Sequence, residues 1–173
     1  MDLFESMPVA AVINNEIFCV HAGLSKGFPL ISSIEKLRRP LAIPESGEIS
    51  DLFWSDPSPA IKEWGPSPRG GTVCWGSAAA HAFMSANSIK TIVRAHQVVR
   101  DGVGFPFAPD RSVVTVYSAS KGAAGPNTAG FLKVDENGAL KNSKLPAVSP
   151  DAYMLVYWAD RRPLPTIRRA KTP

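Results

Sequence analysis

The chain has 173 residues and a formal net charge of +4, with 45% hydrophobic and 20% charged residues, the ordinary make-up of a globular domain large enough for a core. No apolar run approaches the length of a bilayer span, and the acidic start differs from the basic start of a signal peptide. We therefore expect an intracellular protein, cytoplasmic or nuclear, without a membrane span, and the composition excludes membrane-spanning functions.

The first predicted element is a short buried strand over residues 17–20, which ends at His21 and a small-residue turn. A second strand, over residues 89–93, leads through Arg94 and Ala95 to His96. Two histidines at strand ends in one sheet can meet at one edge, and neutral imidazole is a common metal ligand, so the pattern indicates a shared metal ion. Because the two residues are far apart in sequence, two hydrogen-bonded core or edge histidines are the alternative.

Between these strands, helical spacing of apolar residues predicts a helix over residues 28–37, ended by Pro40, and then a loop over residues 42–50. Asp56 precedes Pro57, and the residue before a proline is pushed out of helical geometry, so the Asp56 carboxylate lies in an extended or turn segment. A contact that only stabilises the turn is the alternative to a role at a functional site.

Residues 66–71 read PSPRGG. Prolines stiffen the approach, glycines let a ligand come close to the backbone, and the guanidinium of Arg69 offers a planar fork of donors suited to phosphate oxygens. An arginine that is only solvated is the alternative. An Ala-rich helix follows over residues 77–88, and it carries His81 as a surface or packing residue.

The later segments are β-rich. Residues 113–117 are predicted as a strand of a second sheet, residues 127–134 as the final strand, and residues 135–138 as a hairpin turn. The two cysteines, Cys19 and Cys74, lie in apolar strand-like settings without metal-site spacing, so we expect buried, reduced thiols.

The net charge comes from the C-terminal end. Residues 1–157 contain fourteen Lys or Arg against fourteen Asp or Glu, so the excess of +4 lies in residues 158–173, which prolines interrupt. We expect a flexible basic extension that is solvated or contacts an acidic partner. The extension lacks interleaved aromatics and a long basic run, which disfavours nucleic acid.

Taken in order, the motifs resemble the C-terminal half of the catalytic domain of metal-dependent phosphoprotein phosphatases, the serine/threonine family that includes calcineurin. The fit extends over about the first 147 residues. The matching words are MPVAAVINNEIFCVHAGLS at 7–25, RRP at 38–40, DLFWSDP at 51–57, PRG at 68–70, RAHQVVRDG at 94–102 and VTVYSAS at 114–120.

The resemblance implies an α/β (α+β) fold, a calcineurin-like metallophosphatase β-sandwich flanked by helices, of which only the C-terminal half is present. Residues 1–147 would form that half-domain, and residues 148–173 a basic, Pro-containing extension. The implied activity is hydrolysis of phosphoserine and phosphothreonine esters in phosphoprotein substrates by a two-metal mechanism, with regulatory subunits as further partners.

The resemblance also implies roles for four residues. His21 and His96 would be ligands of the second of two metal ions, which are Mn, Fe or Zn in such enzymes. Arg69 matches the arginine that contacts substrate phosphate. Asp56 would lie beside the active-site cleft and is a candidate to position the residues that contact metal or phosphate.

The main departure from the family is an absence. Three earlier family motifs, GDxHG, GDxxDRG and GNHE, supply the other metal ligands and the histidine that protonates the leaving group. None occurs in this sequence, which has no Gly-Asp or Gly-Asn dipeptide. Two imidazoles without carboxylates compensate a dication poorly, so we expect weak or no metal binding by this chain alone and no catalytic residue within it.

Two smaller departures concern the cleft: Ala22 stands in place of a family glycine, and Gly122 in place of a cleft tyrosine. Substrate preference is therefore not implied. Three interpretations follow. The chain is the C-terminal half of an active phosphatase, or a non-catalytic pseudophosphatase that binds phosphate or an acidic partner through Arg69 and the basic extension, or a half that assembles with another chain.

Overall fold

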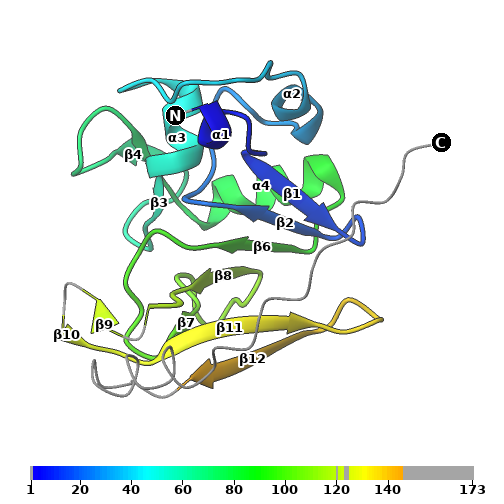
Figure 1. Cartoon of the computed structure of the whole chain (residues 1–173), viewed down its shortest axis with the longest axis vertical. Coiled ribbons are helices and arrows are strands. Elements are labelled where there is room, and N and C mark those ends of the chain that lie inside the picture. The colour runs from blue at the N-terminus through cyan, green and yellow to red at the C-terminus, as the bar shows by residue number, and fades with distance from the viewer. Residues whose placement is uncertain (1, 120, 123–124, 146–173) are drawn as a thin grey trace, which may run out of the picture.

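The computed structural model describes residues 2–119, 121–122 and 125–145, and the predicted basic extension over residues 148–173 lies outside them. No described helix has the length and apolar character required to span a bilayer. The elements follow one another (Figure 1) as α1 (Asp2–Glu5), β1 (Ala10–Ile13), β2 (Ile17–Val20), α2 (Ile31–Glu35), α3 (Glu48–Trp54), β3 (Asp56–Pro57), β4 (Trp64–Pro66), β5 (Val73–Trp75), α4 (Ser77–Asn87), β6 (Thr91–Arg94), β7 (Val103–Gly104), β8 (Val113–Val116), β9 (Lys121–Gly122), β10 (Gly125–Pro126), β11 (Ala129–Val134) and β12 (Leu140–Leu145).

A five-stranded sheet with the order β1-β2-β6-β8-β7 forms the centre of the described chain. β1 and β2 form a hairpin whose turn residues, Asn14 and Asn15, have φ of 52° and 57°, the left-handed conformation that tight hairpin turns need and asparagine tolerates. β2, β6 and β8 are parallel neighbours. The residues that follow these three strands therefore emerge at one edge of the sheet.

The placement of β8 corrects a prediction. The sequence predicts residues 113–117 in a second sheet, but β8 pairs with β6 in the same sheet as β2. Its residues Val113, Val114 and Thr115 are all buried, which is typical of a parallel strand covered on both faces. A short buried pattern does not reveal which sheet the strand joins, because the path of the chain decides the pairing.

Helix α2 is shorter than the predicted helix over residues 28–37. Leu30 is extended, with φ −120° and ψ 138°, so the helix begins only at Ile31. The N–H of Ile31 donates a 2.8 Å hydrogen bond to Oδ1 of Asn87, at the end of α4. The missing cap of α2 is thus supplied by a residue distant in sequence, which local patterns do not show.

Helix α3 begins inside the segment 42–50 that is predicted as a loop. Gly47 precedes it with φ of 94°, a conformation that strains other residues. Leu52 of α3 is 1% exposed and belongs to the core. The helix is therefore held by burial of its apolar side against the domain more than by a local capping signal.

Helix α4, predicted over residues 77–88, extends from Ser77 to Asn87 and covers one face of the central sheet (Figure 1). The ring of Phe83 in α4 packs against that of Phe18 in β2, with centroids 4.9 Å apart. This contact centres the core, whose fully or nearly buried members include Phe18, Leu24, Leu52, Trp75, Ala80, Phe83, Ile92 and Val113.

The hairpin of β11 and β12 lies at the end of the molecule opposite α1 and α2 (Figure 1). Its turn is the predicted one over residues 135–138, where a carboxylate oxygen of Asp135 accepts the N–H groups of Asn137 and Ala139. At its start Gly130 packs against Gly102 so closely that a Cβ on either would overlap the backbone of the other. This contact fixes the hairpin against the loop before β7.

Candidate metal and phosphate site

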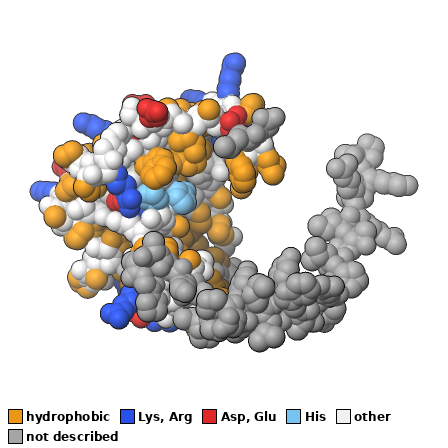
Figure 2. Space-filling view, turned by 60° about the vertical axis from the view of Figure 1, so that its left-hand side comes forward, with side chains coloured by type: hydrophobic (Ala, Val, Ile, Leu, Met, Phe, Trp, Pro, Cys, Tyr) orange, Lys and Arg blue, Asp and Glu red, His pale blue; other side chains and the backbone are white. Residues whose placement is uncertain are grey.

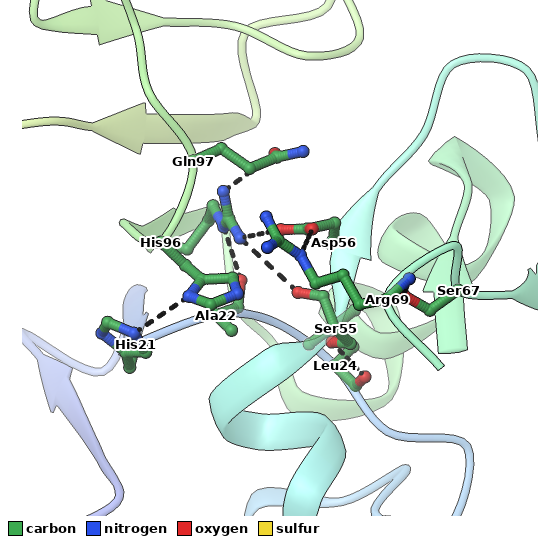
Figure 3. A network of polar contacts seen from close by, with 10 residues as sticks. His21, Ala22, Leu24, Ser55, Asp56, Ser67, Arg69, His96 and Gln97 are labelled. Atoms are coloured by element: carbon green, nitrogen blue, oxygen red, sulfur yellow. Dashed lines mark hydrogen bonds and ion pairs between the residues drawn. The ribbon is translucent and has the colours of Figure 1, made fainter. Parts of the chain in front are cut away.

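Two histidines meet at the edge of the central sheet (Figure 3). His21 directly follows β2, His96 lies two residues beyond β6, and the two strands are parallel neighbours. Nε2 of His21 lies 3.2 Å from Nδ1 of His96, and the ring centroids are 5.1 Å apart. The structure thus brings the two rings together as predicted, while their role as metal ligands stays a prediction.

The position of His96 is held by its backbone and by an aromatic neighbour. His96 has φ of 61°, a left-handed conformation that costs free energy in a non-glycine residue. Its ring meets the indole of Trp54 edge to face, with centroids 5.2 Å apart. Among the described residues its Nε2 is buried without a hydrogen-bond partner, which marks a place where a polar ligand would be accommodated.

Arg94 connects the segments that carry the site. Its side chain is fully buried, and Nη2 lies 2.7 Å from Oδ1 of Asp56. Nη1 donates to Oε1 of Gln97 at 2.9 Å, and Nε donates to the carbonyl of Ala22. Ala22 and Gln97 are the neighbours of His21 and His96 in sequence, so this one guanidinium holds both histidine-bearing segments in place.

Burial lowers the pKa of Arg94 to about 10, although the adjacent carboxylate of Asp56 opposes the shift. Arg94 therefore stays charged at neutral pH, and it needs its carboxylate partner because an unpaired buried charge is costly.

Asp56 joins Arg69 to the same network. Its Oδ2 accepts the Nε–H of Arg69 at 2.8 Å, and its side chain is only 9% exposed. Asp56 lies in the extended β3, as the following proline predicts. The carboxylate thus pairs with two arginines, while its role at a functional site stays a prediction.

Arg69 lies on the turn that follows β4 and is the member of this network that is exposed to solvent. Its backbone N–H donates to Oγ of Ser67 at 3.2 Å, while its side chain is 44% exposed. Figure 2 shows histidine side chains at the surface, beside hydrophobic and basic side chains. An exposed guanidinium whose orientation a carboxylate fixes is suited to binding the oxygens of a phosphate.

The surroundings favour neutral imidazoles. Burial lowers the pKa of His21, and the nearby charge of Arg94 lowers it further. Burial also lowers the pKa of His96; Asp56 opposes this effect, and Arg69, His21 and Arg94 add to it. Neutral imidazole is the form that binds metal ions, so both rings are ready for ligation at neutral pH.

The two histidines fit part of a metal site. Two nitrogens 3.2 Å apart can coordinate one ion at the usual bond length of about 2.0–2.1 Å. Within the described ranges, however, no group of three or more His, Cys, Asp or Glu residues is placed to hold an ion. The other ligands of a complete shell would have to come from outside these ranges.

Two residues of the site are missing from the sequence-based prediction. Arg94 ends the otherwise apolar strand β6, and a charged residue in such a strand is a signal that it has a buried partner. Trp54, which contacts His96, gives no comparable signal, because the sequence does not distinguish an exposed tryptophan from a packed one. His81 lies outside the site and is exposed as expected, 2.8 Å from Asp110, and Gly122 lies in β9, opposite Gly125.

Comparisons with known proteins agree with this geometry. The family model of calcineurin-like phosphoesterases matches residues 1–100. The structure is similar to that of a protein serine/threonine phosphatase from Saccharomyces cerevisiae with similarity to human phosphatase PP5, with a TM-score of 0.75 and 27% sequence identity. The match covers 86% of this chain and 50% of that one, so this chain spans about half the length of the solved phosphatase.

Proposed function

Because the chain belongs to the calcineurin-like phosphoesterase family, and has its metallophosphatase fold over half of the domain, we propose that it is the C-terminal half of the catalytic domain of a protein serine/threonine phosphatase. The complete domain would hydrolyse phosphoserine and phosphothreonine esters in phosphoproteins inside the cell. The observation that supports this most is the imidazole pair, 3.2 Å apart, beside the network of Arg94, Asp56 and Arg69.

Each residue of the site has a distinct proposed role. His21 and His96 would hold one metal ion through Nε2 and Nδ1. Two such ions, Mn, Fe or Zn, would supply Lewis-acid chemistry that activates water and offsets the charge of the phosphoryl oxygens. Arg69 orients the phosphate, and Asp56 fixes the guanidinium of Arg69 through a 2.8 Å contact. Arg94 positions both histidine-bearing segments.

The chain alone is expected to be inactive. Among the described residues, no carboxylate or further ligand is placed to hold an ion together with the two imidazoles. The sequence contains none of the motifs GDxHG, GDxxDRG and GNHE. An ion bound by two neutral ligands keeps most of its water and little of its affinity. Regulatory subunits would therefore act on the complete domain.

Manganese titration tests the metal role. Paramagnetic Mn²⁺ is added to the ¹⁵N-labelled chain, and amide resonances near His21 and His96 are expected to broaden first. The double substitution His21→Ala with His96→Ala should remove this broadening, and His81→Ala, which changes an exposed histidine elsewhere, should keep it. Broadening that is unchanged in the double variant would contradict the proposal.

A phosphatase assay tests the expected inactivity. With p-nitrophenyl phosphate and Mn²⁺, the chain should show no turnover above that of the double variant. Robust turnover by the chain that is lost in the double variant would show that two imidazoles suffice, and it would overturn the half-domain interpretation.

The second candidate function is non-catalytic binding of phosphate or phosphorylated partners, favoured by the exposure of the Arg69 guanidinium. In metal-free buffer, a phosphoserine peptide would then bind to the chain, Arg69→Met would abolish binding, and Arg100→Met, at another exposed arginine, would not. Under the leading proposal this peptide binds only weakly without metal. An acidic partner for residues 158–173 would bind outside the described residues.

A further inference from the structure

One buried carboxylate has no part in the site described above. Asp51 lies in α3 and is 5% exposed. Its Oδ2 accepts a hydrogen bond from the hydroxyl of Ser25 at 2.8 Å, and its Oδ1 accepts one from the N–H of Val73 at 3.2 Å. A buried carboxylate is costly unless it is hydrogen-bonded, so these two donors account for its place inside the domain.

The two donors adjoin the two parts of the proposed site. Ser25 ends the segment of residues 21–25, the His21 segment, which begins with the first histidine. Val73 directly follows residues 67–72, the Arg69 turn, which carries the exposed arginine. The carboxylate of Asp51 thus joins the segment of a proposed metal ligand to the turn of the proposed phosphate ligand.

The His21 segment has two further hydrogen bonds to the end of α3. The N–H of Ala22 donates to the carbonyl of Leu52 at 3.1 Å. The hydroxyl of Ser55 donates to the carbonyl of Leu24 at 2.9 Å (Figure 3). These bonds should hold the segment on the helix even without the carboxylate.

The Arg69 turn depends more on the carboxylate. β3 pairs with the last two residues of β5, so Val73, the first residue of β5, lies outside that pairing. The N–H of Val73 donates to Asp51 instead of to a strand. A second bond between the turn and the start of α3, from the N–H of Gly47 to the carbonyl of Gly71, is longer, at 3.4 Å. Asp51 therefore replaces a strand partner at the base of the turn.

We propose that Asp51 is a positioning residue of the site, which fixes the place of the Arg69 turn relative to the His21 segment through its hydrogen bond to Val73. Asp51 touches no reacting group and acts only through the backbone of the turn. The inference rests on the proposed function, and it adds how the phosphate ligand is aligned with the metal ligands.

The electrostatics of Asp51 indicate a suitable replacement. Burial raises the pKa of Asp51 above its ordinary value of 3.8; the hydrogen bonds from Ser25 and Val73 oppose this effect, and the nearby charge of Glu48 adds to it. A neutral side chain of the same shape avoids the cost of a buried charge. Asp51→Asn can keep an acceptor for Val73, while its Nδ2 donates to the hydroxyl oxygen of Ser25.

Hydrogen exchange of two arginine side chains tests the positioning. In ¹⁵N spectra of the full chain, the Nε–H of Arg69 reports its 2.8 Å bond to Asp56. The Nε–H of Arg94, which donates to the carbonyl of Ala22 from a fully buried side chain, is the internal reference. In Asp51→Ala, the Nε–H of Arg69 should exchange about fivefold faster or more, and that of Arg94 at an unchanged rate. Equal acceleration of both, or of neither, would overturn the proposal.

Three further variants separate positioning from a loss of stability. Asp51→Asn should restore the slow exchange of Arg69. Ser25→Ala removes only the other hydrogen bond of the carboxylate, and Asn87→Ala removes a helix cap distant from the site, so both should leave that exchange unchanged. Faster exchange in any of the three would contradict the assignment. If Asp51→Ala does not fold, Asp51→Ser replaces it, because a serine hydroxyl can bond within the helix and is too short to serve Val73.

Titration with inorganic phosphate in metal-free buffer distinguishes this inference from the proposed function. Phosphate should shift the Nε–H resonance of Arg69 in the native chain. Its affinity should fall by about threefold or more in Asp51→Ala and be retained in Asp51→Asn. Equal affinities of the native chain and Asp51→Ala would refute the positioning role. Faster exchange in Asp51→Ala, without any shift by phosphate in the native chain, would uphold that Asp51 holds the turn and contradict the phosphate-binding role of Arg69.

Discussion

At the scale of single residues, the site depends on the pairing of one carboxylate with two guanidinium groups. Arg94 is fully buried, and Asp56, which is 9% exposed, is its only described acidic partner. The exposed partner, Arg69, adds a second positive charge. The carboxylate therefore matters for folding and for the geometry of the site at once.

The substitution Asp56→Asn should destabilise the fold by about 3 kcal/mol, since removal of one partner leaves a buried charge uncompensated. The measurement is the free energy of unfolding in urea. A surface pair supplies the control: Lys90 and Glu16 are 72% and 37% exposed, so Glu16→Gln should cost less than about 1 kcal/mol. Similar losses in both variants would show that Arg94 does not need Asp56.

The segment after His21 distinguishes two small residues. Ala22 is fully buried, and its methyl group is accommodated. A Cβ at Gly23 would instead overlap the indole of Trp75 and the hydroxyl of Ser55. Gly23→Ala should therefore destabilise the fold by about 1–3 kcal/mol through overpacking, and Ala22→Gly by about 1 kcal/mol at most.

Thermal unfolding of the two variants checks this order of destabilisation. Both substitutions change the flexibility of the backbone, but only Gly23→Ala adds a Cβ that overlaps Trp75 and Ser55. A stable Gly23→Ala variant with unshifted His21 resonances would contradict it.

At the scale of elements, α2 depends on a side chain from α4. Oδ1 of Asn87 accepts the N–H of Ile31, while Nδ2 donates to the carbonyls of Pro29 and Phe83. Asn87→Ala should cost about 1–2 kcal/mol, the usual loss for a helix cap. Asn87→Asp keeps the acceptor but sets a carboxylate oxygen against the carbonyls of Pro29 and Phe83 at the C-terminal end of α4, so it should cost at least as much. Hydrogen exchange of the Ile31 amide gives the local readout.

Helix α4 is also joined to the loop before β8. Asp110 accepts hydrogen bonds from the N–H and hydroxyl of Ser112 and lies 2.8 Å from Nε2 of His81. The hydrogen bond from the backbone N–H of Ser112 is the main reason that the pKa of Asp110 lies below its usual value of 3.8, and partial burial opposes this lowering.

A lowered pKa in the folded state gives a contribution to stability that is present above the unfolded pKa and lost as the pH falls through the folded one. Asp110→Asn should therefore lower stability by a constant amount from neutral pH down to about pH 4, and the difference should shrink at lower pH. Urea unfolding across this range checks it, in a His81→Gln background that removes the neighbouring titration. A difference that grows on acidification would contradict the assignment.

At the scale of the whole molecule, an apolar groove of about 580 Å³ lies between the central sheet and the hairpin of β11 and β12, and Ile13, Cys19 and Phe131 are among the residues that line it. Cys19 is half-buried, not buried as the sequence predicts. The isolated chain should bind the dye anilinonaphthalene sulfonate, which fluoresces on apolar surfaces that complete domains cover. Ile13→Glu should reduce this fluorescence and Val12→Glu should not, since only Ile13 lines the groove. Native-state fluorescence equal to that of a compact control protein would show that the groove is already covered.

Much of the site could be predicted from sequence because its residues sit at strand ends. The apolar runs before His21 and before His96 predict two strands. Parallel pairing of these strands then brings Nε2 of His21 to 3.2 Å from Nδ1 of His96. Asp56 is extended because a proline follows it. Arg94 was not predicted, because its role depends on contacts with Ala22 and Asp56, 72 and 38 residues away in sequence.

The fold shows the same division. The strand of residues 17–20, helix α4 and the turn at residues 135–138 follow from local periodicity and turn residues. Helix α3 begins within residues 42–50, which are predicted as a loop, because burial of Leu52 stabilises the helix more than its local sequence does.

The amino-acid sequence by itself determined the family and predicted candidate residues for its chemistry, because side-chain chemistry and strand-end positions are local properties. Only the tertiary structure decided that Asp56 pairs with two arginines, that β8 joins the central sheet, and that an apolar groove adjoins the histidines. These features arise from contacts between distant segments, and their free energies depend on burial and charge pairing that exist only once the chain has folded.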